Sequence, residues 1–426
     1  MYKEISVCPL SGGAPTVYKD DMMNVLVLNS GSSSLKYKLI KMPGGNELIK
    51  GEAERVGIKT SGKSRIIHSV LGRERIIETP MEDHNAALKA ALCLLADDFL
   101  IDPGMRFDVF AHRYVHPGTF FSSTVKITRS VLTKLKKTFS LAPIHNPVSY
   151  RLMEFCHKKY PGVPQFAVFD TSFHRSILPE FSNYAIPFKI AKKYGIKKVG
   201  FHGLSHKYVS EEACRFVSKE ASTQRLISCH LGTGGSSVCA IKAGKSINNS
   251  MGFTPLEGLM MNTRCGDIDP GAVFYIMFKE KFSVGEADRM LNNRSGVLGV
   301  FNSSSDLRDA IKEMGSDRTA KMTVDMYVRR VRTYLCFYAL ILKKADILVF
   351  TDSLGQGSSV LREHICLNLG FMGIMLDKER NDSYAGGIAE ISSGLSETRV
   401  LVVPTDEEAM IAREAYKETC KDDTSC

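Results

Sequence analysis

The sequence lacks the features that mark membrane and secreted proteins. Its longest purely apolar stretch inside an expected helix, Tyr334 to Leu342, is far too short to span a bilayer. The eleven cysteines are odd in number and scattered, and none forms a CxxC pair, which favours a reduced, cytoplasmic protein. Residues 1–21 have no continuous apolar core, so we expect an N-terminal extension rather than a signal peptide.

The sequence also has no low-complexity segment and no long Pro/Gly linker that would mark a domain boundary. Its net charge of +10 is spread along the chain in short clusters, which argues against a nucleic-acid-binding stripe. A modest basic excess suits small anionic substrates. A length of 426 residues exceeds one compact core and indicates two or three domains.

One unusual loop is present twice. The apolar run from Asn24 to Leu28 leads into Asn29-Ser-Gly-Ser-Ser-Ser-Leu-Lys36, and the run from Leu226 to Cys229 leads into His230-Leu-Gly-Thr-Gly-Gly-Ser-Ser237. Glycines at such turns allow close backbone approach, so N–H groups and hydroxyls can surround phosphate oxygens. Two ordinary β-hairpins are the alternative for either loop alone. Together, the loops predict a duplicated fold with a cleft between its halves.

Strand-like and helical patterns alternate along the chain, which predicts an α/β protein with layered sheet and helices. Expected strands are 24–29, 35–40, 166–170, 226–231, 236–241, 346–351 and 399–403. Expected helices are 82–100, 146–159, 205–219 and 319–344. We place the domain boundary near Phe169-Asp170, between the two loops.

Residues 250–271 have neither helical nor strand periodicity, yet they are rich in apolar side chains. This is typical of a structured loop packed into a cleft. A guanidinium there, that of Arg264, would always be charged and could grip a carboxylate or phosphoryl group with two hydrogen bonds. The alternative for Arg264 is a surface salt bridge to Asp267 or Asp269.

Three short segments, 111–118, 168–174 and 199–206, combine His, Arg and Asp with small residues. Phosphoryl transfer to an acid needs cations on the equatorial oxygens and an aligning or metal-holding carboxylate. Four side chains would supply that set: Arg113, Arg264, His202 and Asp170. Individually, each histidine is more often a structural residue.

Two other chemistries fit the same histidines less well. The pairs His112/His116 and His202/His206 have the HxxxH spacing of zinc ligands on a helix. However, Pro117-Gly118 and Gly203 disfavour a continuous helix through either pair, and no HExxH or CxxC accompanies them. A Ser-His-Asp hydrolase is disfavoured because no G-x-S-x-G turn follows a strand.

Taken together, the motifs resemble acetate kinase, in order and at the family spacing, over roughly residues 24 to 415. The matching segments are Asn29-x-Gly-Ser-Ser-Ser-x-Lys36, His112-Arg-x-Val-His116, Leu141-Ala-Pro-Ile-His-Asn-Pro147, Phe169-Asp-Thr-Ser-Phe-His174, Gly200-Phe-His-Gly-x-Ser-His206 and Thr254 through Pro270. The resemblance implies the two-domain, duplicated superfold of acetate and sugar kinases, Hsc70 and actin, usually as a homodimer. Its C-terminal helix returns to the first domain, giving 22–169 plus 407–426 as domain I and 170–406 as domain II.

The resemblance also implies roles for individual residues. Arg113 and Arg264 would clamp the acetate carboxylate and the phosphoryl group, with His202 stabilising the transition state, His145 nearby and Asp170 as the catalytic carboxylate. Asn29 and Glu407 would place Mg²⁺, with Mn²⁺ as a substitute. An apolar pocket for the methyl group is implied for Val115, Ile144, Phe201 and Pro255.

Donor phosphates would meet Lys36 and the loop from His230 to Gly234, and here the sequence departs from the ATP-using members. Thr233 and Gly235 replace Asn and Ala, and the adenosine loop Phe-Thr-Ala-Gly-Ile-Gly-Glu-Asn becomes Phe350-Thr-Asp-Ser-Leu-Gly-Gln-Gly357. Ser353 thus puts a side chain where a bare glycine admits the base. The full expected donor set is Lys36, His230, Leu231, Gly232, Thr233, Gly234, Asp306, Leu307, Arg308, Ser353, Leu354, Gly355, Gln356 and Gly357.

These departures are similar to the diphosphate-using acetate kinase of amoebae, so both ATP and diphosphate remain open as donors. The expected activity interconverts acetate plus a phosphoryl donor with acetyl phosphate. A propionate or butyrate kinase is the alternative within the class, and a non-catalytic nucleotide-binding protein of the actin superfold is the alternative outside it. The expected partners are small molecules: acetate, acetyl phosphate, and ATP/ADP or diphosphate/phosphate. We expect neither a nucleic-acid nor a membrane partner.

Overall fold

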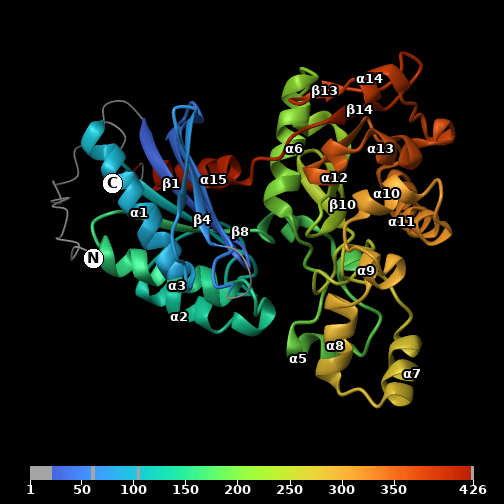
Figure 1. Ribbon diagram of the computed structural model, residues 1–426, viewed down its shortest axis with the longest axis horizontal. Coiled ribbons are helices and arrows are strands. Elements are labelled where there is room, and N and C mark those ends of the chain that lie inside the picture. Colours follow the sequence, from blue (N-terminus) through green and yellow to red (C-terminus); the bar gives the residue numbers. More distant parts are fainter. Residues whose placement is uncertain (1–21, 59–62, 103–105, 424–426) are drawn as a thin grey trace. The chain divides into compact units, whose positions relative to one another are not determined.

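The computed structural model describes residues 22–58, 63–102 and 106–423, with the side chains of 422–423 excepted. The expected extension, 1–21, lies outside the described residues. The chain divides into two compact units. The first consists of residues up to Tyr114, Ser123–Val168 and Ile411 onward, and the second of Val115–Ser122 and Phe169–Met410. Each unit is built around one sheet (Figure 1).

The first unit has an eight-stranded sheet in the order β5-β4-β3-β2-β1-β6-β8-β7. Its strands are β1 (Met23–Ser30), β2 (Ser34–Met42), β3 (Asn46–Glu54), β4 (Arg65–Val70), β5 (Arg73–Glu78), β6 (Val109–Tyr114), β7 (Val125–Lys126) and β8 (Gln165–Phe169). Its helices are α1 (His84–Ile101), α2 (Arg129–Lys136), the short η2 (Phe139–Leu141) and α3 (Asn146–Lys159). Helix α15 (Glu407–Asp423) carries residues of both units.

The second unit has a six-stranded sheet in the order β11-β10-β9-β12-β14-β13. Its strands are β9 (Arg225–Leu231), β10 (Ser236–Lys242), β11 (Lys245–Asn249), β12 (Ile347–Thr351), β13 (Ala389–Glu390) and β14 (Arg399–Val402). Its helices are α4 (Pro179–Ser182), α5 (Phe188–Tyr194), α6 (Gly203–Phe216), α7 (Pro270–Glu280), α8 (Val284–Asn293), α9 (Gly296–Phe301), α10 (Leu307–Glu313), α11 (Arg318–Leu342), α12 (Asp352–Gly357), α13 (Ser359–Cys366) and α14 (Lys378–Asp382). Three short 3₁₀ segments complete it: η3 (Ser172–Ser176), η4 (Ala221–Thr223) and η5 (Gly370–Met372).

The two sheets repeat one arrangement. In the first, β1 pairs antiparallel with β2 and parallel with β6. In the second, β9 pairs antiparallel with β10 and parallel with β12. Both sequence loops therefore form the turn of the leading hairpin, as the duplicated pattern predicts. The seven expected strands and four expected helices are all confirmed close to their expected bounds.

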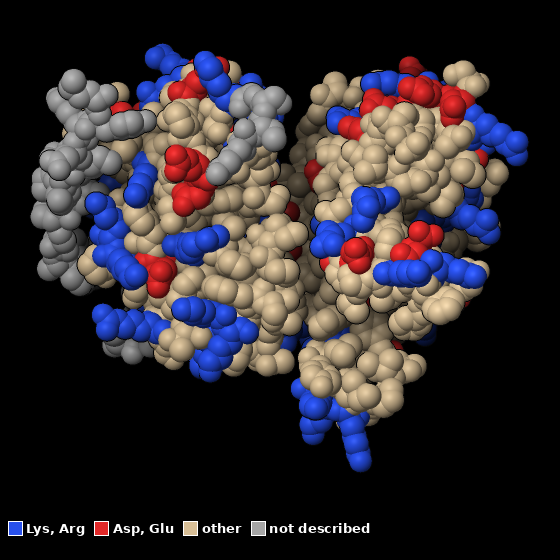
Figure 2. Space-filling view, turned by 60° about the horizontal axis from the view of Figure 1, so that its bottom comes forward, with Lys and Arg blue, Asp and Glu red and all other residues tan. Residues whose placement is uncertain are grey.

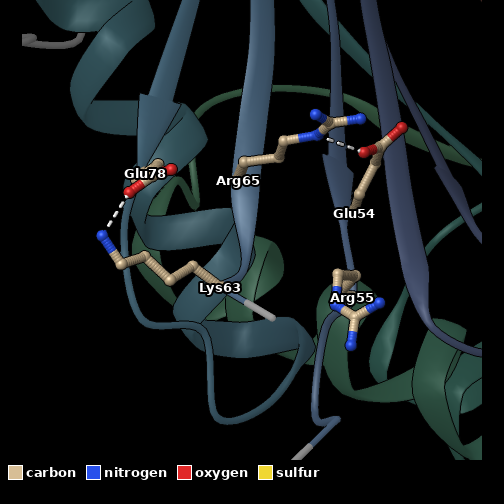
Figure 3. A pocket seen from close by; sticks show the side chains of 5 residues that line it. All are labelled: Glu54, Arg55, Lys63, Arg65 and Glu78. Atoms are coloured by element: carbon tan, nitrogen blue, oxygen red, sulfur yellow. Dashed lines mark hydrogen bonds and ion pairs between the residues drawn. The ribbon is translucent and has the colours of Figure 1, made fainter. Parts of the chain in front are cut away.

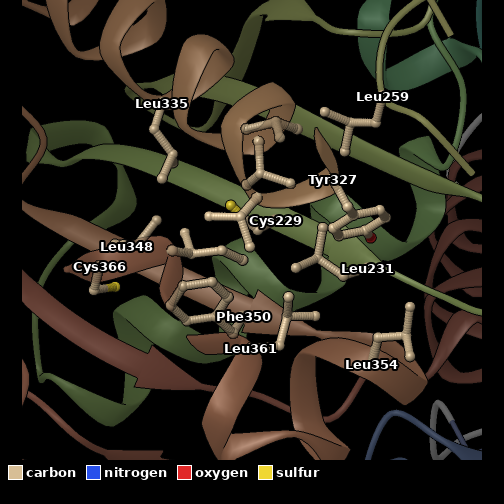
Figure 4. Close-up of a cluster of buried hydrophobic side chains, with 14 of the residues drawn as sticks. Cys229, Leu231, Leu259, Tyr327, Leu335, Leu348, Phe350, Leu354, Leu361 and Cys366 are labelled. Atoms are coloured by element: carbon tan, nitrogen blue, oxygen red, sulfur yellow. The ribbon is translucent and has the colours of Figure 1, made fainter. Parts of the chain in front are cut away.

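Successive side chains along the strands of the second unit point to opposite faces of the sheet, and each face packs against its own apolar layer. Residues such as Cys229, Leu231, Leu348 and Phe350 face one core, which α11 and α13 cover (Figure 4). The intervening residues, including Leu226, Cys239 and Val349, face a second cluster that contains residues of α6. The sheet is thus buried on both faces, and polar residues on the α6 face need internal partners.

One segment belongs to a different unit from the one the sequence suggested. Residues 115–122 were expected in the first domain but are part of the second unit. The guanidinium of Arg175 donates to the carbonyls of Gly118 and Phe121 at 2.6 and 2.7 Å, and the ring of Phe121 stacks on Phe169 at 5.7 Å. Residues 407–410, at the start of α15, are likewise in the second unit.

Charged side chains are dispersed over the surface. On the face seen in Figure 2, Lys and Arg are spread over both units with Asp and Glu among them. None of the helices in the described part of the chain combines the length and apolar composition that crossing a membrane requires.

Candidate active site

The candidate site of the second unit begins on the α6 face of its sheet. His230 and Ser237 are register partners across the β9–β10 hairpin. They alternate with the core residues Leu231 and Val238, so both point toward α6. There the Nδ1 atom of His230 hydrogen-bonds with the hydroxyl of Ser205, on the first turn of α6, at 2.8 Å. The hairpin and the start of α6 therefore bring their polar groups together.

The carboxylate of Asp170 is fixed at the N-terminus of α6. It is 1% exposed and accepts hydrogen bonds from the main-chain N–H groups of His202 and Leu204, at 3.2 and 3.4 Å. These N–H groups have no partner inside the helix, and the helix dipole favours a negative charge there. Gly203 permits the arrangement, because a Cβ at that residue would lie 2.1 Å from the Asp170 carbonyl oxygen.

The imidazole of His202 projects from the left-handed residue that precedes α6, with φ +55°. Its Nδ1 atom hydrogen-bonds with the Ser237 hydroxyl at 2.9 Å, and its ring stacks on His230 with centroids 4.1 Å apart. His206, one turn further along α6, hydrogen-bonds with the same hydroxyl and with that of Ser228, at 2.8 and 3.0 Å. Both ring nitrogens of His206 are thus occupied by hydroxyl groups, which argues against zinc ligation by the pair His202/His206.

Arg264 lies in the long irregular segment between β11 and α7, which confirms the loop expected at 250–271. Among the described residues, its guanidinium forms no ion pair. The two alternative partners are engaged elsewhere: Asp267 with Arg330 at 3.3 Å, and Asp269 as the N-cap of α7. Burial lowers the pKa of Arg264, which means that its charge is poorly solvated. A partly buried guanidinium that no carboxylate neutralises is able to bind an anion.

Arg264 and His202 both reach the β9–β10 loop. An ideal Cβ built on Gly235 would lie 3.3 Å from Nε2 of His202 and 3.5 Å from Nη1 of Arg264. The loop itself is closed by a hydrogen bond from the Gly232 N–H to the Gly235 carbonyl, at 3.1 Å. An imidazole and a guanidinium thus meet at a turn of small residues.

The other side of this loop contacts the first turn of α12. The Nε2 atom of His230 lies 3.0 Å from Oδ2 of Asp352, and the Thr233 N–H donates to the Ser353 hydroxyl at 3.0 Å. Burial lowers the pKa of His230, but the carboxylates of Asp352, Glu407 and Asp170 together outweigh burial and raise that pKa. The sequence reasoning identified Ser353 but missed Asp352, although this acid was visible as one of the departures in the same loop.

Several expected donor residues have side chains that point away from solvent. Leu231, Leu307 and Leu354 are at most 1% exposed in the core of the second unit, so only their backbones are available to a ligand. Asp306 caps α10 and pairs with Arg308 at 2.5 Å. The Gly355 and Gln356 carbonyls accept from the buried Arg362, at 2.9 and 2.6 Å, and Gly357 ends α12.

The remaining expected residues of the first unit lie along β1, β2, β6 and the start of α3. Asn29 and Arg113 share one face of neighbouring parallel strands, and Nη1 of Arg113 is 3.5 Å from Oδ1 of Asn29. Lys36, on β2, is half-exposed and lies 4.0 Å from Glu52. His145 precedes α3 as its N-cap.

The four residues expected to line an acyl pocket differ in burial. Val115 and Phe201 are buried in the second unit, and the Phe201 ring meets His116 edge-on at 6.2 Å. Pro255 is partly buried in the loop before Arg264. Ile144, in the first unit, is 60% exposed.

The metal-binding groups expected from the sequence are the oxygens of Asn29 and Glu407, and the HxxxH pairs were the alternative. Among the described residues, no group of three or more His, Cys, Asp or Glu side chains is placed to hold a metal. His112 lies in β6, and His116 follows it outside any helix, so that pair lacks the helical zinc geometry. Asn29 and Glu407 offer oxygen atoms, which suit Mg²⁺ bound mainly by water and phosphate.

A pocket in the first unit lies away from these residues (Figure 3). It is lined by Glu54, Arg55, Lys63, Arg65 and Glu78. Two ion pairs of exposed side chains cross it, Lys63 with Glu78 at 2.7 Å and Arg65 with Glu54 at 2.6 Å. Both of its carboxylates pair with two of its three cations, and it contains none of the expected site residues.

Comparisons with known proteins agree over most of the chain. The model of the acetokinase family matches residues 24–413. The acetate kinase of Heliobacterium modesticaldum is 42% identical over 93% of this chain and 99% of its own length. The crystal structure of Porphyromonas gingivalis acetate kinase superposes with a TM-score of 0.85 at 38% identity, covering 93% of this chain and 99% of that one. A propionate kinase from Francisella tularensis gives 0.84 at 34% identity, covering 93% and 100%.

Proposed function

Because the chain belongs to the acetokinase family, we propose that it transfers a phosphoryl group reversibly between acetate and a phosphoryl donor, with acetyl phosphate as the product. Family membership and the two-sheet α/β fold agree with the sequence-based expectations. The single observation that carries the proposal is the approach of Arg264 and His202 to one position of the β9–β10 loop. A desolvated cation and an imidazole at a phosphate-type turn are suited to a phosphoryl group in transfer.

Each residue then has a specific task. Asp170, held by two main-chain N–H groups, presents a carboxylate in a fixed orientation for alignment of the reacting groups. Arg264 and Arg113 form bidentate hydrogen bonds with the acetate carboxylate and with the equatorial oxygens of the phosphoryl group. His202 donates to charge that develops during transfer, and its orientation is set by Ser237. We place His145 next to these residues, near the transferring phosphoryl group.

Mg²⁺ is the divalent ion that we propose, with Asn29 and Glu407 as its protein ligands and Mn²⁺ as a substitute. When bound, the ion would neutralise charge on the phosphate oxygens. Two protein oxygens fit this ion, because Mg²⁺ usually retains water and takes further ligands from substrate phosphates.

For the donor side we propose inorganic diphosphate, with inorganic phosphate as the acceptor in the reverse direction. The support is steric. Asp352 and Ser353 occupy the first turn of α12 with side chains that contact the β9–β10 loop. The loop backbone, Lys36 and His230 would still surround a free phosphate group. ATP is the competing donor, because Asp306 and Arg308 are retained.

A homodimer is our proposal for the assembly, with α7 at its interface. None of the residues of α7 is buried in the chain. Phe274, Tyr275 and Phe278 are 69%, 63% and 78% exposed. Such aromatic patches are characteristic of protein interfaces. Phe278→Lys should convert the dimer to a monomer in light scattering, whereas an unchanged mass would exclude α7.

We also propose a cytoplasmic location. The nine cysteines in the described part of the chain are free thiols, as in a reducing compartment.

The activity can be tested by product trapping. The purified chain is incubated with acetate, Mg²⁺ and either diphosphate or ATP, and acetyl phosphate is captured with hydroxylamine. We expect acetohydroxamate to form with diphosphate. If neither donor gives product, the proposed function is wrong.

A further inference from the structure

Two side chains from the first turn of α12 hold the β9–β10 loop. Oδ2 of Asp352 lies 3.0 Å from Nε2 of His230, at the start of the loop. The Ser353 hydroxyl accepts the Thr233 N–H at 3.0 Å, in its middle. We call these four residues the loop clasp. Register explains their proximity, because Thr351 and His230 are neighbours on the parallel strands β12 and β9.

The clasp depends on an unusual backbone conformation. Asp352 has φ +63°, in the left-handed region that side chains other than glycine, asparagine and aspartate rarely adopt. The Ser353 N–H stabilises it by donating to Oδ1 of Asp352 at 2.7 Å. Strained residues that several contacts maintain are concentrated at functional sites.

Gly232 and Asp352 are sterically complementary. A Cβ at Gly232 would lie 2.1 Å from Oδ2 of Asp352, so any side chain there would displace the carboxylate. The carboxylate therefore lies directly against the backbone of the loop.

His230 is surrounded by other titratable groups. Its ring stacks on His202, and the His206 ring lies edge-on at 6.0 Å. Asp352, Glu407 and Asp170 provide the negative charges that act on it. Its Nδ1 atom contacts Ser205, whose hydroxyl also accepts from Thr405 at 2.8 Å. Both ring nitrogens are thereby fixed, with Asp352 as the hydrogen-bonded acid.

We propose that Asp352 is a positioning residue for the phosphoryl donor: through His230 and together with Ser353, it fixes the β9–β10 loop in the conformation that receives a free inorganic phosphate group. This rests on the proposed function. The carboxylate faces Nε2 at 3.0 Å and therefore favours the protonated form of the His230 imidazole next to the loop. Asparagine at residue 352 would keep the size of the side chain but lose the charge.

The test compares wild type with Asp352→Asn and Asp352→Glu, using acetyl phosphate with inorganic phosphate between pH 6 and 8. In Asp352→Asn we expect the KM for phosphate to rise about tenfold per pH unit once His230 loses its proton, with kcat little changed. Because the Asp352 carboxylate raises the pKa of His230, this rise in KM should begin at a higher pH in wild type than in Asp352→Asn, and Asp352→Glu should move it back toward the wild-type pH. Ser353→Ala should raise KM without adding pH dependence.

A second measurement, the titration of the His230 imidazole, does not depend on enzymatic activity. The His230 imidazole is followed by NMR and assigned by its disappearance in His230→Asn. Its titration midpoint should be clearly lower in Asp352→Asn than in wild type. Glu397→Gln, which removes the exposed ion pair with Lys344, serves as a control and should change neither readout.

The outcomes separate the two proposals. If acetyl phosphate is not consumed by any protein, the proposed function fails, and the imidazole titration alone decides the role of Asp352. If the His230 imidazole titrates at the same pH in wild type and in Asp352→Asn, the proposed role of Asp352 is wrong, whatever the activity. Active proteins with identical pH profiles of KM would also overturn it.

Discussion

Arg264 and His202 approach the same backbone position, Gly235, although they come from a loop and from the residue before a helix. Their nearest atoms, Nη1 and Nε2, would lie 3.5 and 3.3 Å from a Cβ built there. Glycine at this residue therefore leaves space that a ligand group can occupy next to both side chains.

Removal of Arg264 should affect the reaction more than the fold. Arg264→Ala removes a cation that meets charge developing on the phosphoryl group, so we expect a loss of about 2 to 4 kcal/mol in transition-state stabilisation. Arg113→Ala should give a loss of similar size. The measurement is kcat/KM for acetyl phosphate consumption. Arg294→Ala, an exposed arginine after α8, is the matched control. Near wild-type turnover in Arg264→Ala would exclude the proposed clamp.

The acyl chain should be selected by steric fit. Val115 and Phe201 are buried and Pro255 is partly buried, which leaves little freedom for a longer chain if they line the pocket. One additional methylene typically changes selectivity by about 1 to 3 kcal/mol. Acetate should therefore be preferred over propionate by a moderate factor, and over butyrate by more. Competition between the three acids measures this, and equal rates with butyrate would indicate the alternative acyl kinase.

Stability should fall on acidification below pH 6.5 because of buried imidazoles. Burial lowers the pKa of His112, His116 and His174 to about 4. Between pH 6.5 and 4 the unfolded chain binds protons that the folded chain does not, so the free energy of unfolding rises with pH in this range. Each such histidine contributes up to about 2 kcal/mol between pH 6.5 and 5.

Urea unfolding at several pH values measures this dependence. His112→Asn should reduce the slope of unfolding free energy against pH, whatever its effect at pH 7. An unchanged slope would show that His112 binds its proton equally in both states. His230 has the opposite sign. Because its pKa is raised, its contribution is present at low pH and is lost as pH rises through that pKa.

The sequence predicted the parts of the fold whose signals are local. The apolar runs of β1 and β9 and the Gly/Ser turns were sufficient for both hairpins. Strand β5, Arg-Glu-Arg-Ile-Ile-Glu, was missed because an exposed edge strand has no apolar pattern to read. Helix α7 was missed because it is apolar but buries no residue.

Contacts between residues that are far apart in the sequence could not be predicted from local patterns. The pairing of His230 with Asp352 depends on the register of β9 with β12, which brings Thr351 next to His230. Likewise, 115–122 belongs to the second unit because Arg175 binds its carbonyls, and nothing within that segment signals this. Residue chemistry pointed to Asp170, His202 and Arg264 as parts of a phosphoryl-transfer set, and motif resemblance suggested the individual roles that are proposed for them.

The identity of the donor should respond to Ser353. Ser353→Gly removes the hydroxyl that accepts the Thr233 N–H and opens the first turn of α12. We expect the ratio of activity with ADP to activity with inorganic phosphate to increase. Ser359→Gly, in the next helix, is the control. If Ser353→Gly leaves the ratio unchanged, this side chain does not select the donor.

A single competition experiment decides whether the chain transfers a phosphoryl group from acetyl phosphate to an inorganic acceptor. Acetyl phosphate, Mg²⁺, inorganic phosphate and ADP are mixed with the purified chain, and ³¹P NMR follows all species in one tube. We expect diphosphate to form at least as fast as ATP while acetyl phosphate declines. Formation of ATP alone would contradict the proposed donor, and persistence of acetyl phosphate with both acceptors would contradict the activity itself.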